Sequence, residues 1–130
     1  MKVKARTIAE PAILKNERLV LDVLQDDDIG RYTVLCTTSM EPTTFSTAIK
    51  QIYWFPDKLV KKGDVVVLYT KGGKQSEKKN QDDSISHFFY WGLSEPVWLD
   101  NNKAVAVLAH LDDWEIAKPL ERVAKTGTSE

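Results

Sequence analysis

Histidine and aspartate residues in the second half of the chain have side chains suited to metal chemistry. Imidazole and carboxylate groups together suit zinc or a harder transition metal. The residues in question are His87, His110, Asp112 and Asp113. A small metal-dependent hydrolase would need them to converge in one pocket. An aspartate pair after a strand is more typical of a turn, so we predict no metal site and no cofactor and keep the hydrolase as an alternative function.

The only cysteine, Cys36, excludes an internal disulfide. It lies in the β-type run from Tyr32 to Thr37, where a buried thiol behaves as a small hydrophobic side chain. A catalytic pair with His87 or His110 would need an exposed thiol within reach of the base. The acidic run from Asp26 to Asp28 lacks the ligand spacing of an EF-hand and predicts a turn. We therefore assign no catalytic residue, and the sequence favours a protein without enzymatic activity.

A lysine-rich segment follows residue 70. Four of its lysines could contact phosphate groups, which would make binding fall steeply with salt. They are Lys71, Lys74, Lys78 and Lys79. Acidic residues interleave with them and the segment has no aromatic residue, so a solvated mobile loop is the preferred interpretation. A nucleic-acid-binding domain that uses this loop remains a second alternative.

The aromatic residues point instead to a protein partner. The run from Phe88 to Trp91 places two rings on each side of a strand, so one pair packs in the core while the other is exposed, covered by the C-terminal segment or used in an interface. Tyrosine and tryptophan are enriched among interface hot spots. The predicted partner-contact residues are Tyr53, Phe89, Trp91 and Trp114.

The composition describes one ordinary globular domain. The chain has 130 residues, of which 42% are hydrophobic and 28% charged, which is outside the range of disordered chains. A formal net charge of −1 gives no global field that would attract nucleic acid or a membrane. There is no signal-peptide pattern and no apolar run of about 18 residues that could span a bilayer. We expect a soluble protein that is cytoplasmic or otherwise intracellular.

Alternating and apolar runs predict the strands. Residues Arg18 to Leu24 place Leu19, Leu21 and Val23 on a buried face, and the acidic turn that follows predicts a hairpin with Arg31 to Thr38. The apolar run from Val65 to Thr70 predicts a central strand. Further extended segments are expected at 48–55, 85–91, 97–99 and 104–111, and a turn at 100–103 would join the last two in a β-meander.

The C-terminal end has a different pattern. Trp114, Ile116 and Ala117 could begin a short helix, which Pro119 would stop because it lacks the N–H for an internal helical bond. We predict one domain over residues 1–123, with a short irregular or helical segment at its end, and a flexible tail over 124–130.

Three segments resemble the lamin-tail domain family. They are Leu59 to Tyr69, an apolar strand after a glycine-containing turn; Phe88 to Gly92, an aromatic strand ending at glycine; and Val97 to Val107, a closing hairpin. The resemblance covers residues 52–111. It implies an all-β, immunoglobulin-like β-sandwich without enzymatic activity, working as a binding and assembly module. We therefore expect a non-enzymatic protein-interaction or structural module whose partner is another protein or a second copy of the chain.

Overall fold

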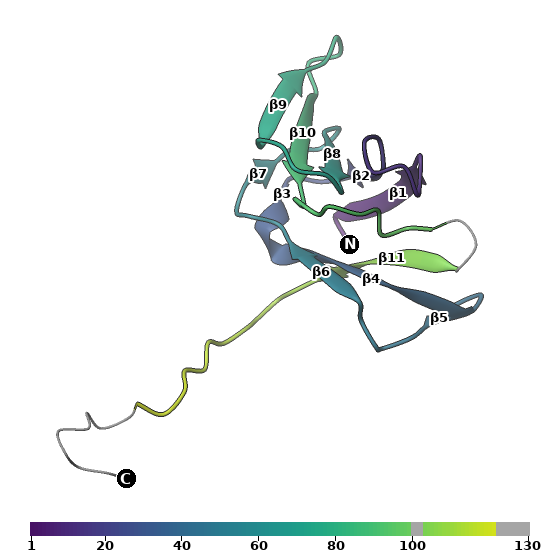
Figure 1. Cartoon of the computed structure of the whole chain (residues 1–130). Coiled ribbons are helices and arrows are strands. Elements are labelled where there is room, and N and C mark those ends of the chain that lie inside the picture. The colour runs from purple at the N-terminus through teal and green to yellow at the C-terminus, as the bar shows by residue number, and fades with distance from the viewer. Residues whose placement is uncertain (100–102, 122–130) are drawn as a thin grey trace, which may run out of the picture.

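The computed structural model describes residues 1–99 and 103–121 and is built almost entirely of strands (Figure 1). The strands are β1 (Val3–Ala9), β2 (Arg18–Val23), β3 (Asp27–Asp28), β4 (Tyr32–Glu41), β5 (Thr44–Phe45), β6 (Gln51–Trp54), β7 (Leu59–Val60), β8 (Val65–Tyr69), β9 (Ser76–Lys79), β10 (Ile85–Tyr90) and β11 (Ala104–His110). A single 3-10 turn, η1 (Ile29–Arg31), stands before β4. The predicted all-β sandwich is confirmed.

The larger sheet has the strand order β1-β2-β8-β10-β9. Strand β8 occupies its centre, as its near-continuous apolar sequence predicted. It pairs antiparallel with β2 on one side and parallel with β10 on the other. Strand β9 forms the outer edge beyond β10.

The second sheet is organised around β4, the longest strand. Strand β11 pairs along one side of β4, while β6 and β5 pair with the other side, all antiparallel. The short β3–β7 pair forms a separate ladder. The core lies between the two sheets, because their inward-facing side chains form one cluster. That cluster includes the predicted Leu19, Leu21 and Val23, together with Val34, Cys36, Phe55, Val66, Leu68, Phe89 and Trp98.

The predicted hairpin between β2 and β4 is wrong, because the two strands belong to different sheets. The Asp28 side chain accepts hydrogen bonds from the backbone N–H groups of Gly30 (2.8 Å) and Lys58 (3.0 Å). These bonds hold the η1 turn, which carries the chain out of the first sheet and into the second. The acidic segment is therefore a crossover between sheets.

Two other predicted segments differ from the structure. The lysine-rich loop contains strand β9, which pairs with β10. Residues 97–99 form no strand, because the N–H groups of Val97 and Trp98 bind the carboxylate of Glu17. Strand β11 consequently pairs with β4 and not with 97–99. The predicted turn at 100–103 falls largely outside the described residues.

The segment after β11 forms no helix over residues 111–121, so the predicted short helix is wrong and the irregular alternative is confirmed for that range. In Figure 1 this segment, which we call the tail, runs away from the two sheets. The predicted flexible tail over 124–130 lies outside the described residues. In the part of the chain that the structure describes, no helix is long and apolar enough to cross a membrane.

Candidate interaction surface

The outer side of the β4–β6–β11 sheet is formed by uncharged residues. Tyr32, Val34 and Cys36 of β4 point into the core, so the alternate positions of β4 and of its two partners point outward. The outward residues of these paired positions are Thr33, Leu35, Thr37, Ile52, Trp54, Val105, Val107 and Ala109. Two of them, Thr33 and Thr37, are nevertheless buried, at 7% and 1% exposed. We call these eight residues the apolar sheet face.

The part of the apolar sheet face on β6 is open to solvent. The Ile52 side chain is 58% exposed and Trp54 is 44% exposed. The Trp54 indole N–H donates to the carbonyl oxygen of Gly30 at 2.7 Å, which fixes the ring. Trp114 of the tail packs edge-on against it with ring centroids 5.1 Å apart, and the guanidinium of Arg31 lies 5.9 Å from the Trp114 ring. The tail therefore touches one margin of the face.

Of the four predicted partner-contact residues, Trp114 is the one at the surface. Phe89 is 1% exposed and packs edge-on against Phe55 with centroids 5.1 Å apart, so it belongs to the core and the prediction for it is corrected. Tyr53 and Trp91 are partly buried against the same core, with their rings 5.7 Å apart. Burial also raises the pKa of the Tyr53 hydroxyl. These three rings form an internal cluster beneath the second sheet.

The other pair of rings in β10 faces outward on the larger sheet. Tyr90 stacks on Tyr69 of β8 at 5.3 Å with an interplanar angle of 10°. The Lys71 ammonium and the Arg18 guanidinium lie 5.0 and 5.9 Å from the Tyr69 ring, and a Cβ at Gly73 would meet the Tyr90 ring at 2.4 Å. Because neighbouring groups already cover these rings, they offer little free surface on which a nucleic-acid base could stack.

The four lysines of the nucleic-acid alternative do not gather in one patch. Lys71 packs on Tyr69, and Lys79 forms an ion pair with Asp83 at 3.4 Å. Lys78 and Lys79 are neighbours in β9, so their side chains leave opposite sides of the strand. Lys74 is exposed in the preceding loop. The structure therefore does not bring these lysines together.

The residues of the hydrolase alternative are separated as well. His87 lies in β10 of the larger sheet and binds Asp64, whereas His110 ends β11 in the second sheet and lies 3.3 Å from Asp112. Asp113 is exposed in the tail. Within residues 1–99 and 103–121, no three or more histidine, cysteine or acidic side chains are grouped so that they could hold a metal ion. The convergence that this alternative requires is not seen.

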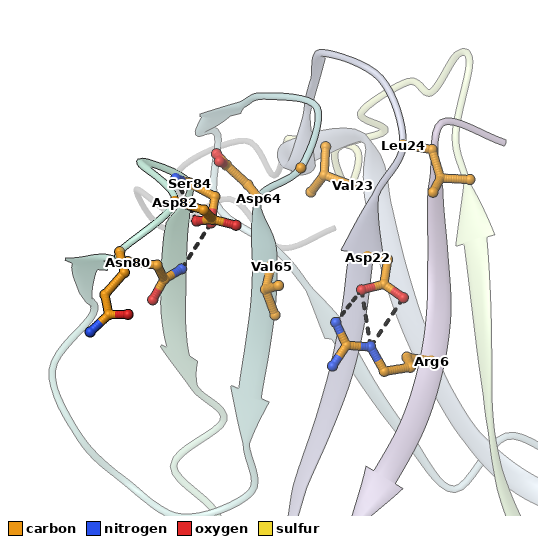
Figure 2. Close-up of a pocket in the computed structure, with 11 residues that line it drawn as sticks. Arg6, Asp22, Val23, Leu24, Asp64, Val65, Asn80, Asp82 and Ser84 are labelled. Atoms are coloured by element: carbon orange, nitrogen blue, oxygen red, sulfur yellow. Dashed lines mark hydrogen bonds and ion pairs between the residues drawn. The ribbon is translucent and has the colours of Figure 1, made fainter.

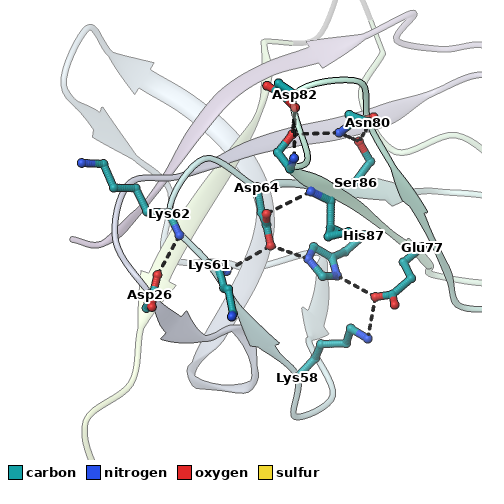
Figure 3. Close-up of polar contacts among 12 residues, drawn as sticks. Asp26, Lys58, Lys61, Lys62, Asp64, Glu77, Asn80, Asp82, Ser86 and His87 are labelled. Carbon is teal, nitrogen blue, oxygen red and sulfur yellow. Dashed lines mark hydrogen bonds and ion pairs between the residues drawn. The ribbon is translucent and has the colours of Figure 1, made fainter.

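The buried pair of Asp64 and His87 is part of a chain of polar contacts (Figure 3). His87 Nε2 lies 2.8 Å from Asp64 Oδ2, and the Asp64 carboxylate also accepts the N–H groups of Lys61 and Ile85, each at 3.0 Å. On the other side, His87 Nδ1 lies 3.5 Å from Glu77, which pairs with Lys58 at 2.9 Å. Burial alone would raise the pKa of Asp64, but these hydrogen bonds outweigh it and hold the pKa below its usual value. The pair joins β8 to β10 and has no nucleophile among its contacts.

A depression of about 730 Å³ lies beside this pair, between the β1–β2 edge and residues 80–84 (Figure 2). Its carboxylates already have partners. Arg6 holds Asp22 and lowers the pKa of that group, while Asp82 accepts the N–H and hydroxyl of Ser84 at 3.0 and 2.6 Å. The acidic groups that line the depression are thus bonded within the protein.

A smaller depression of about 430 Å³ is lined by Asp27, Tyr32, His110 and Asp112 among others. The Tyr32 hydroxyl donates to Asp27 at 2.8 Å. Burial, reinforced by this contact, raises the pKa of Tyr32, so the phenol stays protonated. This cluster also consists of internally satisfied groups.

The predicted buried cysteine is confirmed. Cys36 is buried, its Sγ lies 3.6 Å from the Val97 carbonyl oxygen, and burial raises the pKa of the thiol. Such a thiol is a poor nucleophile at neutral pH.

No protein-family model matches the chain, and no curated protein matches it. The fold and its surface define the class as an all-β sandwich domain with one uncharged outer sheet face. The sequence carried a signal for this face, because the run from Ala104 to Ala109 is apolar at both odd and even positions. A strand of that kind needs cover on both of its sides.

Proposed function

We propose that this chain is a non-enzymatic protein-interaction module and that the apolar sheet face is its contact surface. The observation that carries the proposal is that none of the eight residues of the apolar sheet face is charged. An antiparallel sheet that faces water on one side normally carries polar residues there. Contiguous apolar patches on soluble domains mark interaction sites.

The exposed side chains of β6 offer a partner apolar surface to bury. Burying a large apolar side chain gains about 1.5–3 kcal/mol relative to leaving it in water. Ile52 and Trp54 both retain substantial exposed area. A partner that covered them would gain this energy, and tryptophan is among the residue types enriched in interface hot spots.

The resemblance of residues 52–111 to lamin-tail domains supports the same function, since that family consists of immunoglobulin-like binding and assembly modules. The proposal changes the contact residues, because Tyr53, Phe89 and Trp91 pack inward. Ile52 and Trp54 take their place, and Trp114 is kept from the predicted set.

The proposal can be tested by photo-cross-linking from the apolar sheet face. A photoreactive amino acid is placed at Ile52 in the full chain and, as a matched control, at Lys4, an exposed position on β1 of the other sheet. After irradiation in the native host cell, the adducts are identified by mass spectrometry. We expect a discrete protein adduct from position 52 that is absent from position 4. Equal labelling from both positions, or no adduct from position 52, would overturn the proposal.

A further inference from the structure

The tail has the sequence of a half-buried strand but pairs with no strand. Trp114, Ile116 and Leu120 share one side of an extended segment with Lys118, because all four stand at even positions. Ile116 is 84% exposed and Leu120 is 95% exposed. The described part of the chain therefore has exposed apolar side chains in two places, on the tail and at Ile52 and Trp54 of the apolar sheet face.

The start of the tail is fixed beside that face. The N–H of Leu111 donates to the carbonyl oxygen of Arg31 at 2.8 Å, and Trp114 then packs against Trp54. Beyond Trp114 the segment leaves the body of the domain (Figure 1). Residues 111–121 contain no glycine that would ease a sharp return onto their own sheet.

We propose that the tail of one copy lies across the apolar sheet face of a second copy, and that the second copy does the same in return. This inference rests on the proposed function and names its partner. A two-fold exchange covers both faces and both tails at once, and such isologous pairing is the commonest form of oligomer.

The length of the tail fits this arrangement. The seven extended residues from 115 to 121 span about 23 Å at about 3.3 Å per residue. Strand β11, with seven residues, has about the same length. The tail can therefore follow the apolar sheet face from one end to the other.

The charges of the two surfaces are complementary. The part of the tail beyond Trp114, which would cross the second copy, carries Glu115, Glu121 and Lys118, so its two acidic and one basic residue give a net charge of −1. Basic residues stand at both ends of the apolar sheet face. Arg31 precedes β4, while Lys50 and Lys103 directly precede β6 and β11. Glu41 lies farther out, at the end of β4. An acidic segment with apolar residues on one side is a suitable occupant of this face.

Two complementary variants test the exchange. The face variant Ile52→Asp places a charge on the sheet. The tail variant Ile116→Asp/Leu120→Asp places two charges on the tail. All three positions are exposed, so both variants should keep the fold. Leu59→Asp is the matched control, because Leu59 is an exposed apolar residue on β7, away from both surfaces. Solution mass is measured by light scattering after size exclusion over a range of concentrations, with circular dichroism to confirm folding.

We expect the wild type and Leu59→Asp to form dimers and each charged variant to associate at least about tenfold more weakly. A mixture of the face and tail variants should recover a mixed dimer, because one intact tail then meets one intact face. Normal dimerisation of the tail variant, or failure of the mixture to pair, would overturn the exchange while leaving the face as a contact surface. A monomeric wild type would also overturn it, and the cross-linking test would then decide the proposed function separately.

Discussion

The carboxylate of Glu17 accepts a hydrogen bond of 3.1 Å from the backbone N–H of Trp98, which lies 81 residues farther along the chain. The same carboxylate accepts the N–H groups of Ala12 and Val97 and the hydroxyl of Thr70, at 2.8, 2.9 and 2.6 Å. Glu17 is 0% exposed. These four hydrogen bonds offset the cost of burying the Glu17 side chain. They also fix the segment that carries Trp98 into the core.

Replacing Glu17 by glutamine should therefore destabilise the domain strongly. The amide has one acceptor oxygen and turns N–H groups toward donors, so buried N–H groups lose their partner. We expect the free energy of unfolding to fall by about 2–4 kcal/mol in denaturant titration. Glu10→Gln, which changes an exposed glutamate paired with Arg18, is the control and should cost less than about 1 kcal/mol. Equal losses in the two variants would contradict this role for Glu17.

The Asp64–His87 pair predicts a specific pH dependence. The folded state holds the pKa of Asp64 below its ordinary value of 3.8, so its ionised form contributes stability above that value and loses it as the pH falls through the lower, folded pKa. Asp64→Asn removes the charge at every pH and should cost about 2 kcal/mol at neutral pH.

The difference in unfolding free energy between wild type and Asp64→Asn should accordingly shrink as the pH is lowered from about 5 to about 2. The measurement is a series of denaturant titrations, with Asp113→Asn as a variant of an exposed tail carboxylate. A difference that stays constant across this range would show that ionised Asp64 does not provide the stabilisation.

The close packing at the crossover between the sheets predicts that Gly30 does not tolerate a larger residue. A Cβ at Gly30 would lie 2.7 Å from the backbone Cα of Asp57, whereas at Gly72 the nearest atom would be 3.9 Å away. Backbone cannot move as freely as the end of a side chain, so Gly30→Ala should lower the unfolding free energy by about 1–3 kcal/mol. Gly72→Ala should change it by less than about 0.5 kcal/mol. Similar thermal melting temperatures for both variants would refute the close packing at Gly30.

The burial of Cys36 predicts that its thiol reacts slowly. In the native protein, reaction with an aromatic disulfide reagent at neutral pH should be much slower than in denaturant, because the thiol is covered and its pKa is raised. The release of thiolate absorbance measures both rates. Equally rapid reaction in both states would mean that Cys36 is accessible and would reopen a chemical role for it.

The sequence predicted the strands with strong apolar patterns and missed those without them. Strands β2, β8 and β10 appear where alternation or continuous apolarity indicated them. Strand β1 escaped prediction because the register shifts between Ala5 and Thr7, which breaks the alternation. Strand β9 has the sequence Ser-Glu-Lys-Lys, which is typical of a protected sheet edge but gives no apolar signal.

The contact surface was harder to predict than the fold. Alternation showed that the run from Phe88 to Trp91 must divide its four rings between two sides, but the pairing of β10 with β8 decides which side is inner. Phe89 aligns with the buried Leu68, and Tyr90 aligns with Tyr69. Similarly, the apolar run of β11 indicated a strand, while its long-range pairing with β4 placed Val105 and Val107 on the same side of the sheet as Ile52, with β4 between them. Those pairings depend on tertiary structure, which local patterns do not contain.

Hydrogen exchange at increasing protein concentration tests most directly whether the apolar sheet face is a contact surface covered by a second copy. The measurement compares amide protection in β6 and in residues 111–121, with β9 as an internal reference on the other sheet. We predict that protection of β6 and of the tail rises with concentration in the wild type, stays low in Ile52→Asp, and leaves β9 unchanged. Amide protection of β6 and the tail that does not depend on protein concentration, or that rises equally in Ile52→Asp, would contradict a contact surface covered by a second copy.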